Sequence, residues 1–387
     1  MSRPRVLFVG RRRGALLAAA RLDLEVLLLD DAGRPERAAG AHAGAKVDLS
    51  DLESCVAAAV KLTVDRPVDA VIAVVERAVL PAAAIRETLG IVGPTLEDAL
   101  PWRDKLAMKH AIEDAGIPCA RSLPVEAGTD PAALVSALGL PMVLKPRASS
   151  GSRGTVVARD LASVAAALED GWMAESFVEG MELSVESFVS EGQPRWVNVT
   201  EYLRPGWANI VPAAFGPEIE DAVRALNEEA IAALGVEDGI THLEAFVQVT
   251  ESGVEVVFGE LAQRPPGGYL MELIARAYDF DPWQALIEIA LGREPRLRET
   301  ATRSAGVWFI HPGEGQVLDV SGVEEARAVE GVLAVECDLE VGQTISRREG
   351  TGQHTGRVLV VTGSRDRTAR SLTEAVGLLR VSTRAVA

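Results

Sequence analysis

The sequence predicts an α/β protein with an α+β centre and a strand-rich C-terminal part, and three observations lead to this fold class. The first hundred residues alternate short apolar runs with Ala/Leu-rich stretches, which is typical of a parallel sheet covered by helices on both faces. The middle of the chain carries longer apolar strands separated by few helices. From about Ser304 onward, apolar strands dominate again.

The first region is expected to place candidate residues at one edge of its sheet. Strands are expected at Arg5–Gly10, Glu25–Leu29 and Val68–Val75, with helices over Gly14–Leu22, Leu52–Leu62 and Pro81–Leu89. Ligands of such sheets bind at the carboxyl ends of the strands. The segment Gly10–Gly14 and Glu76 follow two of these strands, so we expect them at the edge of a site.

The middle region begins with an expected amphipathic helix over Trp102–Gly116, which Gly116 and Pro118 end. Asp130 before Pro131, and later Asp160, predict two helix N-termini. Strands are expected at Pro141–Lys145, Thr155–Ala158, Trp172–Phe177, Glu182–Val189, Arg195–Tyr202, Gly239–Val249 and Val254–Leu261. A helix over Glu218–Leu234, two helices ending near Gly292, and C-terminal strands follow, the last at Gly306–Ile310, Val332–Glu336 and Arg357–Val361.

Composition limits the function classes. The 387 residues include 39 Lys+Arg and 56 Asp+Glu, a net charge of −17, which argues against nucleic acid as the main partner. Three scattered cysteines indicate neither a disulfide framework nor a zinc site, and favour a reducing cytoplasm. The N-terminal residues contain no long apolar h-region, and no apolar run approaches the roughly 18–20 residues that span a bilayer, so we expect neither secretion nor membrane insertion.

A strand that ends in Lys145 is followed by a loop of Ser, Gly and Arg residues, Ala148–Gly154. Glycines allow backbone N–H groups to turn toward an anion, hydroxyls add donors, and the cations supply charge. The loop is not a Walker A sequence, because no Gly-Lys-Ser/Thr opens a following helix. It predicts either a phosphate site or a mobile, solvated hairpin loop.

Carboxylates occupy two neighbouring apolar strands. In the first, His242 and Glu244 share one face, and the second carries Glu260 with Arg264 four residues later. Oxygen ligands of this kind suit a hard divalent cation, although an edge with solvent-facing carboxylates would give the same pattern. Glu175 and Glu182 flank another short apolar connection, and this pair is weaker evidence for a functional site than the carboxylates of the two strands.

Together and in order, these features resemble the ATP-grasp superfamily, and the resemblance covers essentially the whole chain. It implies a Rossmann-like domain at 1–100, an ATP-grasp domain at 101–303 and a strand-rich domain at 304–387. It also implies that the phosphates of ATP meet Lys105, Lys145 and the loop residues Ser149, Ser150, Gly151, Ser152 and Gly154. The adenine would meet Glu175, Phe177 and Val178, the ribose Glu182, and Mg²⁺ (or Mn²⁺) would bind Glu244 and Glu260. Arg264 would steady the transferring phosphoryl group.

One departure from the family pattern indicates which branch of the superfamily this chain resembles. Many members carry Glu-x-Asn-x-Arg, with Asn as a further metal ligand, whereas Ala262 stands there in this chain. Gln263 is adjacent, but it would point to the other face of the strand. The L-amino-acid ligase branch, which makes dipeptides, also tends to lack that Asn. The Pro/Gly-rich run Arg264–Gly268 and the segment Gly306–Val335 are similar to that branch.

Weaker candidates for substrate contact are Glu76, Glu201, Arg204, Gly267 and Gly268. Each has a plain alternative: Glu76 would cap a helix or pair near Arg77, and Glu201 with Arg204 would lie in a solvated hairpin. His242 is expected to be a core histidine. The run Arg11–Arg13 is expected to form a solvated loop. No role is assigned to His311 or His354.

The resemblance implies an ATP- and Mg²⁺-dependent carboxylate–amine ligase acting on amino acids or related amines, cytoplasmic, with a homodimer as one option. The alternatives are a carboxylase or formate-dependent transferase of the same superfamily, and a non-catalytic nucleotide-binding regulator. The sequence identifies neither substrate.

Overall fold

The computed structural model describes residues 3–251 and 253–385, and it confirms the expected α/β and α+β fold class. The N-terminal sheet is parallel, with the order β3-β2-β1-β4. Its strands are β1 (Arg5–Val9), β2 (Glu25–Asp30), β3 (Ala43–Lys46) and β4 (Ala70–Ala73), and its helices α1 (Arg13–Arg21), α2 (Leu52–Thr63) and α3 (Val79–Leu89). The sequence analysis missed β3 because Ala-Gly-Ala-Lys forms no apolar run.

Helix α5 (Lys105–Asp114) is shorter than the expected Trp102–Gly116, which was wrong at its start. The Asp104 carboxylate accepts hydrogen bonds from the N–H groups of Leu106 and Ala107, so it caps the helix and fixes Lys105 as its first residue. Trp102 lies before the helix, where its indole donates to the Leu234 carbonyl at 2.9 Å. The short helix α4 (Leu96–Ala99) precedes this turn.

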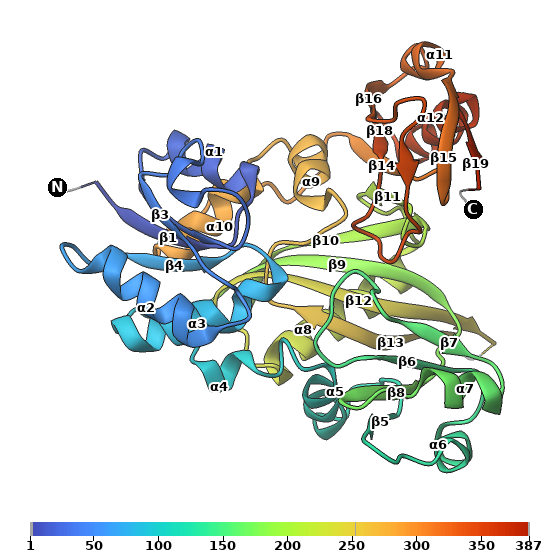
Figure 1. Ribbon diagram of the computed structural model, residues 1–387, viewed down its shortest axis with the longest axis horizontal. Coiled ribbons are helices and arrows are strands. Elements are labelled where there is room, and N and C mark those ends of the chain that lie inside the picture. The colour runs from blue at the N-terminus through green and yellow to red at the C-terminus, as the bar shows by residue number, and fades with distance from the viewer. Residues whose placement is uncertain (1–2, 252, 386–387) are drawn as a thin grey trace.

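A small four-stranded sheet follows α5, with the order β5-β8-β6-β7. Its strands are β5 (Ser122–Val125), β6 (Met142–Pro146), β7 (Val156–Ala158) and β8 (Trp172–Ser176). Helices α6 (Pro131–Leu138) and α7 (Leu161–Ala167) begin at the expected caps, Asp130 and Asp160. This unit lies beside β12 and β13 in Figure 1, and the loop between β6 and β7 contains the Ser/Gly run.

The central sheet has eight strands in the described residues, in the order β13-β12-β9-β10-β11-β14-β18-β16. They are β9 (Met181–Ser190), β10 (Gln193–Arg204), β11 (Ala208–Val211), β12 (Gly239–Thr250), β13 (Gly253–Ala262), β14 (Ser304–Ile310), β16 (Val332–Cys337) and β18 (Gly356–Thr362). Helix α8 (Pro217–Ala233) packs on β13 and β10. Strands from the expected C-terminal domain therefore continue the central sheet, and the boundary at 303/304 stays a prediction.

The remaining helices and strands connect the N-terminal and C-terminal parts of the chain to this sheet (Figure 1). Helices α9 (Leu270–Tyr278) and α10 (Pro282–Ala290) share one hydrophobic core with β1, β2 and β14, which includes Phe8, Leu28, Trp283 and Val307. At the C-terminal end, α11 (Val323–Arg327), α12 (Arg365–Leu378) and the sheet of β15 (Gly315–Ser321), β17 (Thr344–Ile345) and β19 (Arg380–Arg384) complete the fold. Among the described helices, none has the length and apolar character needed to cross a membrane.

Candidate active site

Lys105, the first residue of α5, joins two parts of the chain that the sequence analysis assigned to one site. Its Nζ lies 3.1 Å from Glu260 Oε2 on β13 and donates a 2.9 Å hydrogen bond to the Ser149 carbonyl in the loop after β6. The Lys105 side chain is only 9% exposed, so water screens these contacts weakly. The structure thus brings Lys105, Glu260 and the start of the Ser149–Gly154 loop together.

Lys145 and Glu175 form an ion pair across the small sheet. Lys145 Nζ lies 2.9 Å from Glu175 Oε1, and both side chains are nearly buried. Burial alone would lower the pKa of Lys145, but the carboxylates of Glu175 and Glu260 outweigh that effect and raise it. Lys145 therefore remains a cation in the interior, with charge available for an anionic ligand.

Lys109 is a further candidate for the site, which the sequence analysis missed. It is 2% exposed, donates to the Phe258 carbonyl at 3.1 Å and lies 3.8 Å from Glu175 Oε1. One signal could have revealed it: Lys109 follows Lys105 by four residues, so both lie on the same face of one helix. Burial is the main reason that its pKa is lowered, and Glu175 opposes this effect.

Three carboxylates gather on one face of β9, β12 and β13. Glu244 pairs directly with Glu260 in register, and Glu182 stands opposite Phe246 on the next strand. Burial, followed by repulsion from Glu244 and Glu260, raises the pKa of Glu182. A divalent cation would relieve this repulsion, and oxygen donors suit Mg²⁺. In the described residues no group of three or more His, Cys, Asp or Glu is arranged to hold a metal. The metal site therefore remains a prediction that rests on two ligands, Glu244 and Glu260.

His242 lies next to this acidic group and belongs to a buried hydrogen-bond network. Its Nδ1 is 2.9 Å from Glu186 Oε1, and its Nε2 is 3.6 Å from Glu244 Oε1. Glu186 is fully buried and also accepts from Ser184, Asn198 and Thr200. Burial alone would lower the pKa of His242, but the neighbouring carboxylates of Glu186 and Glu244 raise it to about 9. The expected core histidine therefore also contacts the candidate metal site.

The family Asn is absent from the position beside this network. Ala262 stands opposite His242 in the β12–β13 register. Gln263 turns away, as expected, and its Nε2 donates to the Asp238 carbonyl at 2.8 Å. In this chain neither residue supplies a further oxygen ligand on the carboxylate face.

Glu76 connects the N-terminal region to Arg264. Its two carboxylate oxygens bind Arg103 Nη1 at 2.6 Å and Arg264 Nε at 2.5 Å, and all three side chains are about nine-tenths buried. The alternative of ion pairing for Glu76 is therefore found, although with these two arginines, because Arg77 itself binds Asp31. Glu76 therefore orients Arg264 at the end of β13.

Replacing Glu76 with Gln is expected to lower the free energy of unfolding by about 2 kcal/mol at neutral pH, because two nearly buried guanidinium groups lose the carboxylate that pairs with both. Burial alone would raise the pKa of Glu76, but Arg264 and Arg103 outweigh it and hold the pKa below its ordinary value. This stabilisation is complete above the unfolded-state pKa of about 4.5 and disappears as the pH falls through the lower folded-state pKa.

Urea unfolding of both proteins over a pH series checks this expectation. The difference between wild type and Glu76→Gln should be constant above about pH 5 and shrink in more acidic solution. Glu53→Gln, at an exposed position of α2, is the matched control. An equal loss in the control, or a difference that acid leaves unchanged, would refute the assignment.

The weaker substrate candidates have mixed surroundings. Glu201 is 9% exposed and binds Arg365 of α12 through Oε2 at 2.7 Å, so the solvated-hairpin alternative is wrong for it. Arg204 is exposed, and its guanidinium lies 5.3 Å from the Trp207 ring centre. Gly268 has φ +59°, and its carbonyl accepts from Asn209 at 3.1 Å.

Other predicted positions lie near the surface. Phe177 is 37% exposed in the connection between β8 and β9, next to Val178. The loop residues 151–154 are exposed, whereas Ser149 and Ser150 are half-buried. In the expected solvated run after β1, Arg11 pairs with buried Asp30 at 3.3 Å and Arg12 donates to the Val74 carbonyl at 3.4 Å.

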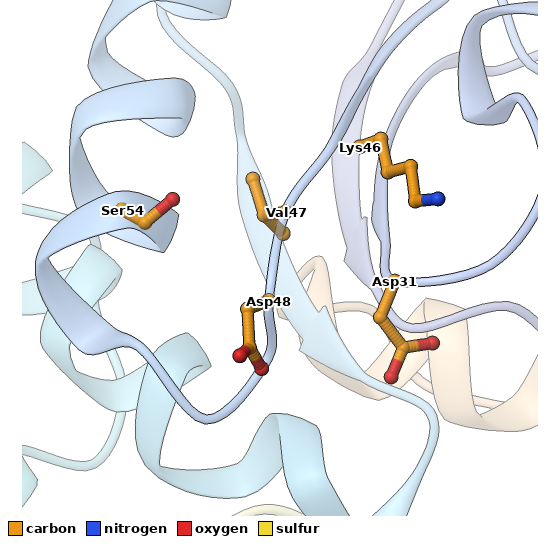
Figure 2. A pocket seen from close by; sticks show the side chains of 5 residues that line it. All are labelled: Asp31, Lys46, Val47, Asp48 and Ser54. Carbon is orange, nitrogen blue, oxygen red and sulfur yellow. The ribbon is translucent and has the colours of Figure 1, made fainter.

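A shallow open pocket lies elsewhere, at the carboxyl ends of β2 and β3. Figure 2 shows its lining side chains, which come from the ends of the strands and from α2: Asp31, Lys46, Val47, Asp48 and Ser54. None of the predicted site residues lines it. The pocket is therefore separate from the cluster around Lys105 and Glu260.

Comparison with known proteins connects this geometry to a family. The family model for the ATP-grasp domain matches residues 110–272, and that for the L-amino acid ligase C-terminal domain 2 matches residues 307–384. The L-arginine-specific L-amino acid ligase of Bacillus subtilis is 27% identical over 324 residues, 79% of this chain and 78% of that protein. The D-alanine–D-alanine ligase of Sodalis glossinidius is 30% identical over 166 residues, 37% of this chain and 45% of that protein.

Solved structures agree on the fold. The L-amino acid ligase from Bacillus licheniformis has a TM-score of 0.82 at 19% identity, covering 99% of this chain and 100% of that one. The N5-carboxyaminoimidazole ribonucleotide synthetase from Thermotoga maritima has a TM-score of 0.76 at 21% identity, covering 98% and 100%. The chain therefore contains an ATP-grasp domain at residues 110–272 and the C-terminal domain 2 of the L-amino acid ligases at residues 307–384.

Proposed function

We propose that this chain is an ADP-forming ligase that joins the carboxylate of an amino acid to the amine of a second amino acid or related amine. The observation that carries the proposal is the position of Lys105, which contacts both the Ser149 carbonyl and Glu260. One cation thereby links the loop proposed to cover the phosphates with the carboxylates proposed to hold the metal. The amino acid class is supported by the C-terminal domain and by the relative that acts on L-arginine.

In the first step, a carboxylate oxygen attacks the γ-phosphorus of ATP. An O–P bond forms, the bond to the departing ADP oxygen breaks, and an acyl phosphate results. Lys145 and Lys105 offset the negative charge of the phosphates, and Arg264, held by Glu76, faces the transferring group. When bound by Glu244 and Glu260, Mg²⁺ or Mn²⁺ would neutralise further phosphate charge.

In the second step, the amine nitrogen attacks the acyl carbon. A C–N bond forms, the C–O bond to phosphate breaks, and the amine proton passes to solvent. Water would attack the same carbon, so the reaction requires a covered site. The Ser149–Gly154 loop is the proposed cover, with its backbone N–H groups and the Ser149, Ser150 and Ser152 hydroxyls as donors.

The remaining roles are proposed from the resemblance to the ATP-grasp family and, for two glutamates, from the ion pairs that they form. We assign Glu175, Phe177 and Val178 to the adenine and Glu182 to the ribose. Because Glu76 is engaged with Arg103 and Arg264, and Glu201 with Arg365, these two glutamates act by orienting cations around the substrate. Arg204, Gly267 and Gly268 remain the proposed direct substrate contacts.

Incubation of the purified protein with ATP, Mg²⁺ and pools of amino acids and amines tests the proposal. We expect ADP and phosphate in equal amounts, together with a product whose mass equals acid plus amine minus water. AMP and pyrophosphate would exclude the acyl-phosphate route. A product formed only when bicarbonate or formate replaces the amino acid would support the carboxylase or transferase alternative instead.

A further inference from the structure

The C-terminal region carries a segment that reaches the proposed phosphate loop, and its role rests on the function proposed above. The segment consists of residues Arg348–Gln353, between β17 and β18, and is here named the clasp. We propose that the clasp holds the Ser149–Gly154 loop closed over ATP and that Arg348 is the positioning residue that shapes it. This gives the C-terminal domain a direct part in the reaction.

Backbone groups make the contact between the clasp and the loop. The Thr351 N–H donates to the Gly151 carbonyl at 3.0 Å. A Cβ on Gly151 would lie 3.0 Å from Thr351 Oγ1, and one on Gly350 would lie 2.8 Å from the Gly151 carbonyl oxygen. The close approach leaves no room for a side chain at position 350, and the φ of +64° at Gly151 favours glycine there.

Arg348 gives the clasp its shape. Its Nη2 donates to the Thr351 carbonyl at 3.0 Å, and its Nε donates to the Gln353 carbonyl at 3.0 Å. The planar guanidinium offers several donors in a fixed geometry, which lysine cannot reproduce. With two carbonyls of the clasp bound to one group, the Thr351 N–H is directed outward to Gly151.

The same guanidinium anchors the clasp to the central sheet. Arg348 Nη2 donates to the Gly206 carbonyl at 2.6 Å, and the guanidinium lies 4.0 Å from the Trp207 ring centre. Gly206 and Trp207 form the turn between β10 and β11, strands of the eight-stranded sheet. The clasp is therefore bound to the central sheet through Arg348 and to the Ser149–Gly154 loop through Thr351.

The loop itself has few other restraints. Residues 151–154 are exposed, and Lys105 holds only the start of the loop, at the Ser149 carbonyl. Without the clasp, the far part of the loop is free to open while ATP remains bound by Lys105 and Lys145. Water could then attack the acyl phosphate, which regenerates the carboxylate and releases phosphate. The signature of this loss is ADP formed without amide.

Arg348→Ala tests the proposal on the full-length protein with ATP, Mg²⁺ and the amino acid substrates found in the pool experiment. We expect the KM for ATP to rise about tenfold. The ratio of ADP to amide should rise clearly above that of wild type, with the KM for the amino acids unchanged. If Arg348 only stabilised the fold, its replacement would leave the ratio of ADP to amide unchanged and would not raise the KM for ATP more than the KM for the amino acids.

Arg347→Ala is the matched control, because Arg347 is adjacent and exposed and makes no hydrogen bond or ion pair within residues 3–251 and 253–385. Arg348→Lys keeps the charge without the fixed fork and should give an intermediate ratio even if the alanine variant folds poorly. Wild-type ratios in both Arg348 variants would overturn the clasp proposal. Absence of amide from wild type would instead overturn the proposed function.

Discussion

Glu260→Ala is expected to reduce ADP formation at least about a hundredfold while leaving the fold intact. Glu260 stands in register with Glu244 and lies 3.1 Å from Lys105 Nζ, so its carboxylate belongs to both the cationic and the acidic parts of the site. Burial alone would raise the pKa of Glu260, but Lys105 and Lys145 outweigh it and lower that pKa strongly. The carboxylate is therefore ionised and ready to hold a cation at neutral pH.

Initial rates of ADP release, measured with saturating ATP and varied Mg²⁺, check this result. Glu255→Ala is the control, because Glu255 lies on the same strand, is exposed, and its side chain makes no hydrogen bond or ion pair in the part of the chain that the structure describes. Circular dichroism and thermal unfolding establish that both variants fold. Normal turnover by a folded Glu260→Ala variant would remove Glu260 from the metal site.

Local patterns were sufficient to predict most elements, because each signal lies within a few residues of its consequence. Asp130 and Asp160 cap α6 and α7 as expected, and the apolar runs of β9, β12 and β13 have strand structure. The start of α5 was misplaced because Trp102 fits the apolar helical pattern, although the Asp104 cap excludes it from the helix. Here the two hydrogen bonds that one capping carboxylate accepts outweighed the periodicity of the apolar residues.

Pairing between distant residues could not be predicted in this way. Lys145 and Glu175 were each assigned to ATP, but their ion pair depends on the register of β6 with β8, which places Val143 opposite Glu175. Glu76 and Arg264 are far apart in sequence, and only the packing of the N-terminal region on the central sheet brings them together. Registers and domain contacts of this kind are set by the whole core.

The sequence analysis also did not predict the network of buried polar residues around Glu186. Glu186 lies in a strand that reads as apolar, and nothing in its neighbours predicts that Ser184, Asn198, Thr200 and His242 surround it. These partners come from β9, β10 and β12, so they meet only after the sheet has formed. The cost of burying a carboxylate without partners explains why all four are present.

Lys145→Ala is expected to weaken ATP binding by about 10- to 100-fold, because it removes a buried cation from a group of carboxylates. Without Lys145, the one ion-pair partner left to Glu175 among the described residues is Lys109, at 3.8 Å. The phosphates of ATP would then approach Glu175 and Glu260 with less compensating charge. Titration calorimetry with ATP and Mg²⁺ measures the loss of affinity directly. Lys61→Ala, an exposed position on α2, should bind ATP as wild type does. Unchanged affinity in folded Lys145→Ala would show that Lys145 stabilises the small sheet through Glu175 and has no role in nucleotide binding.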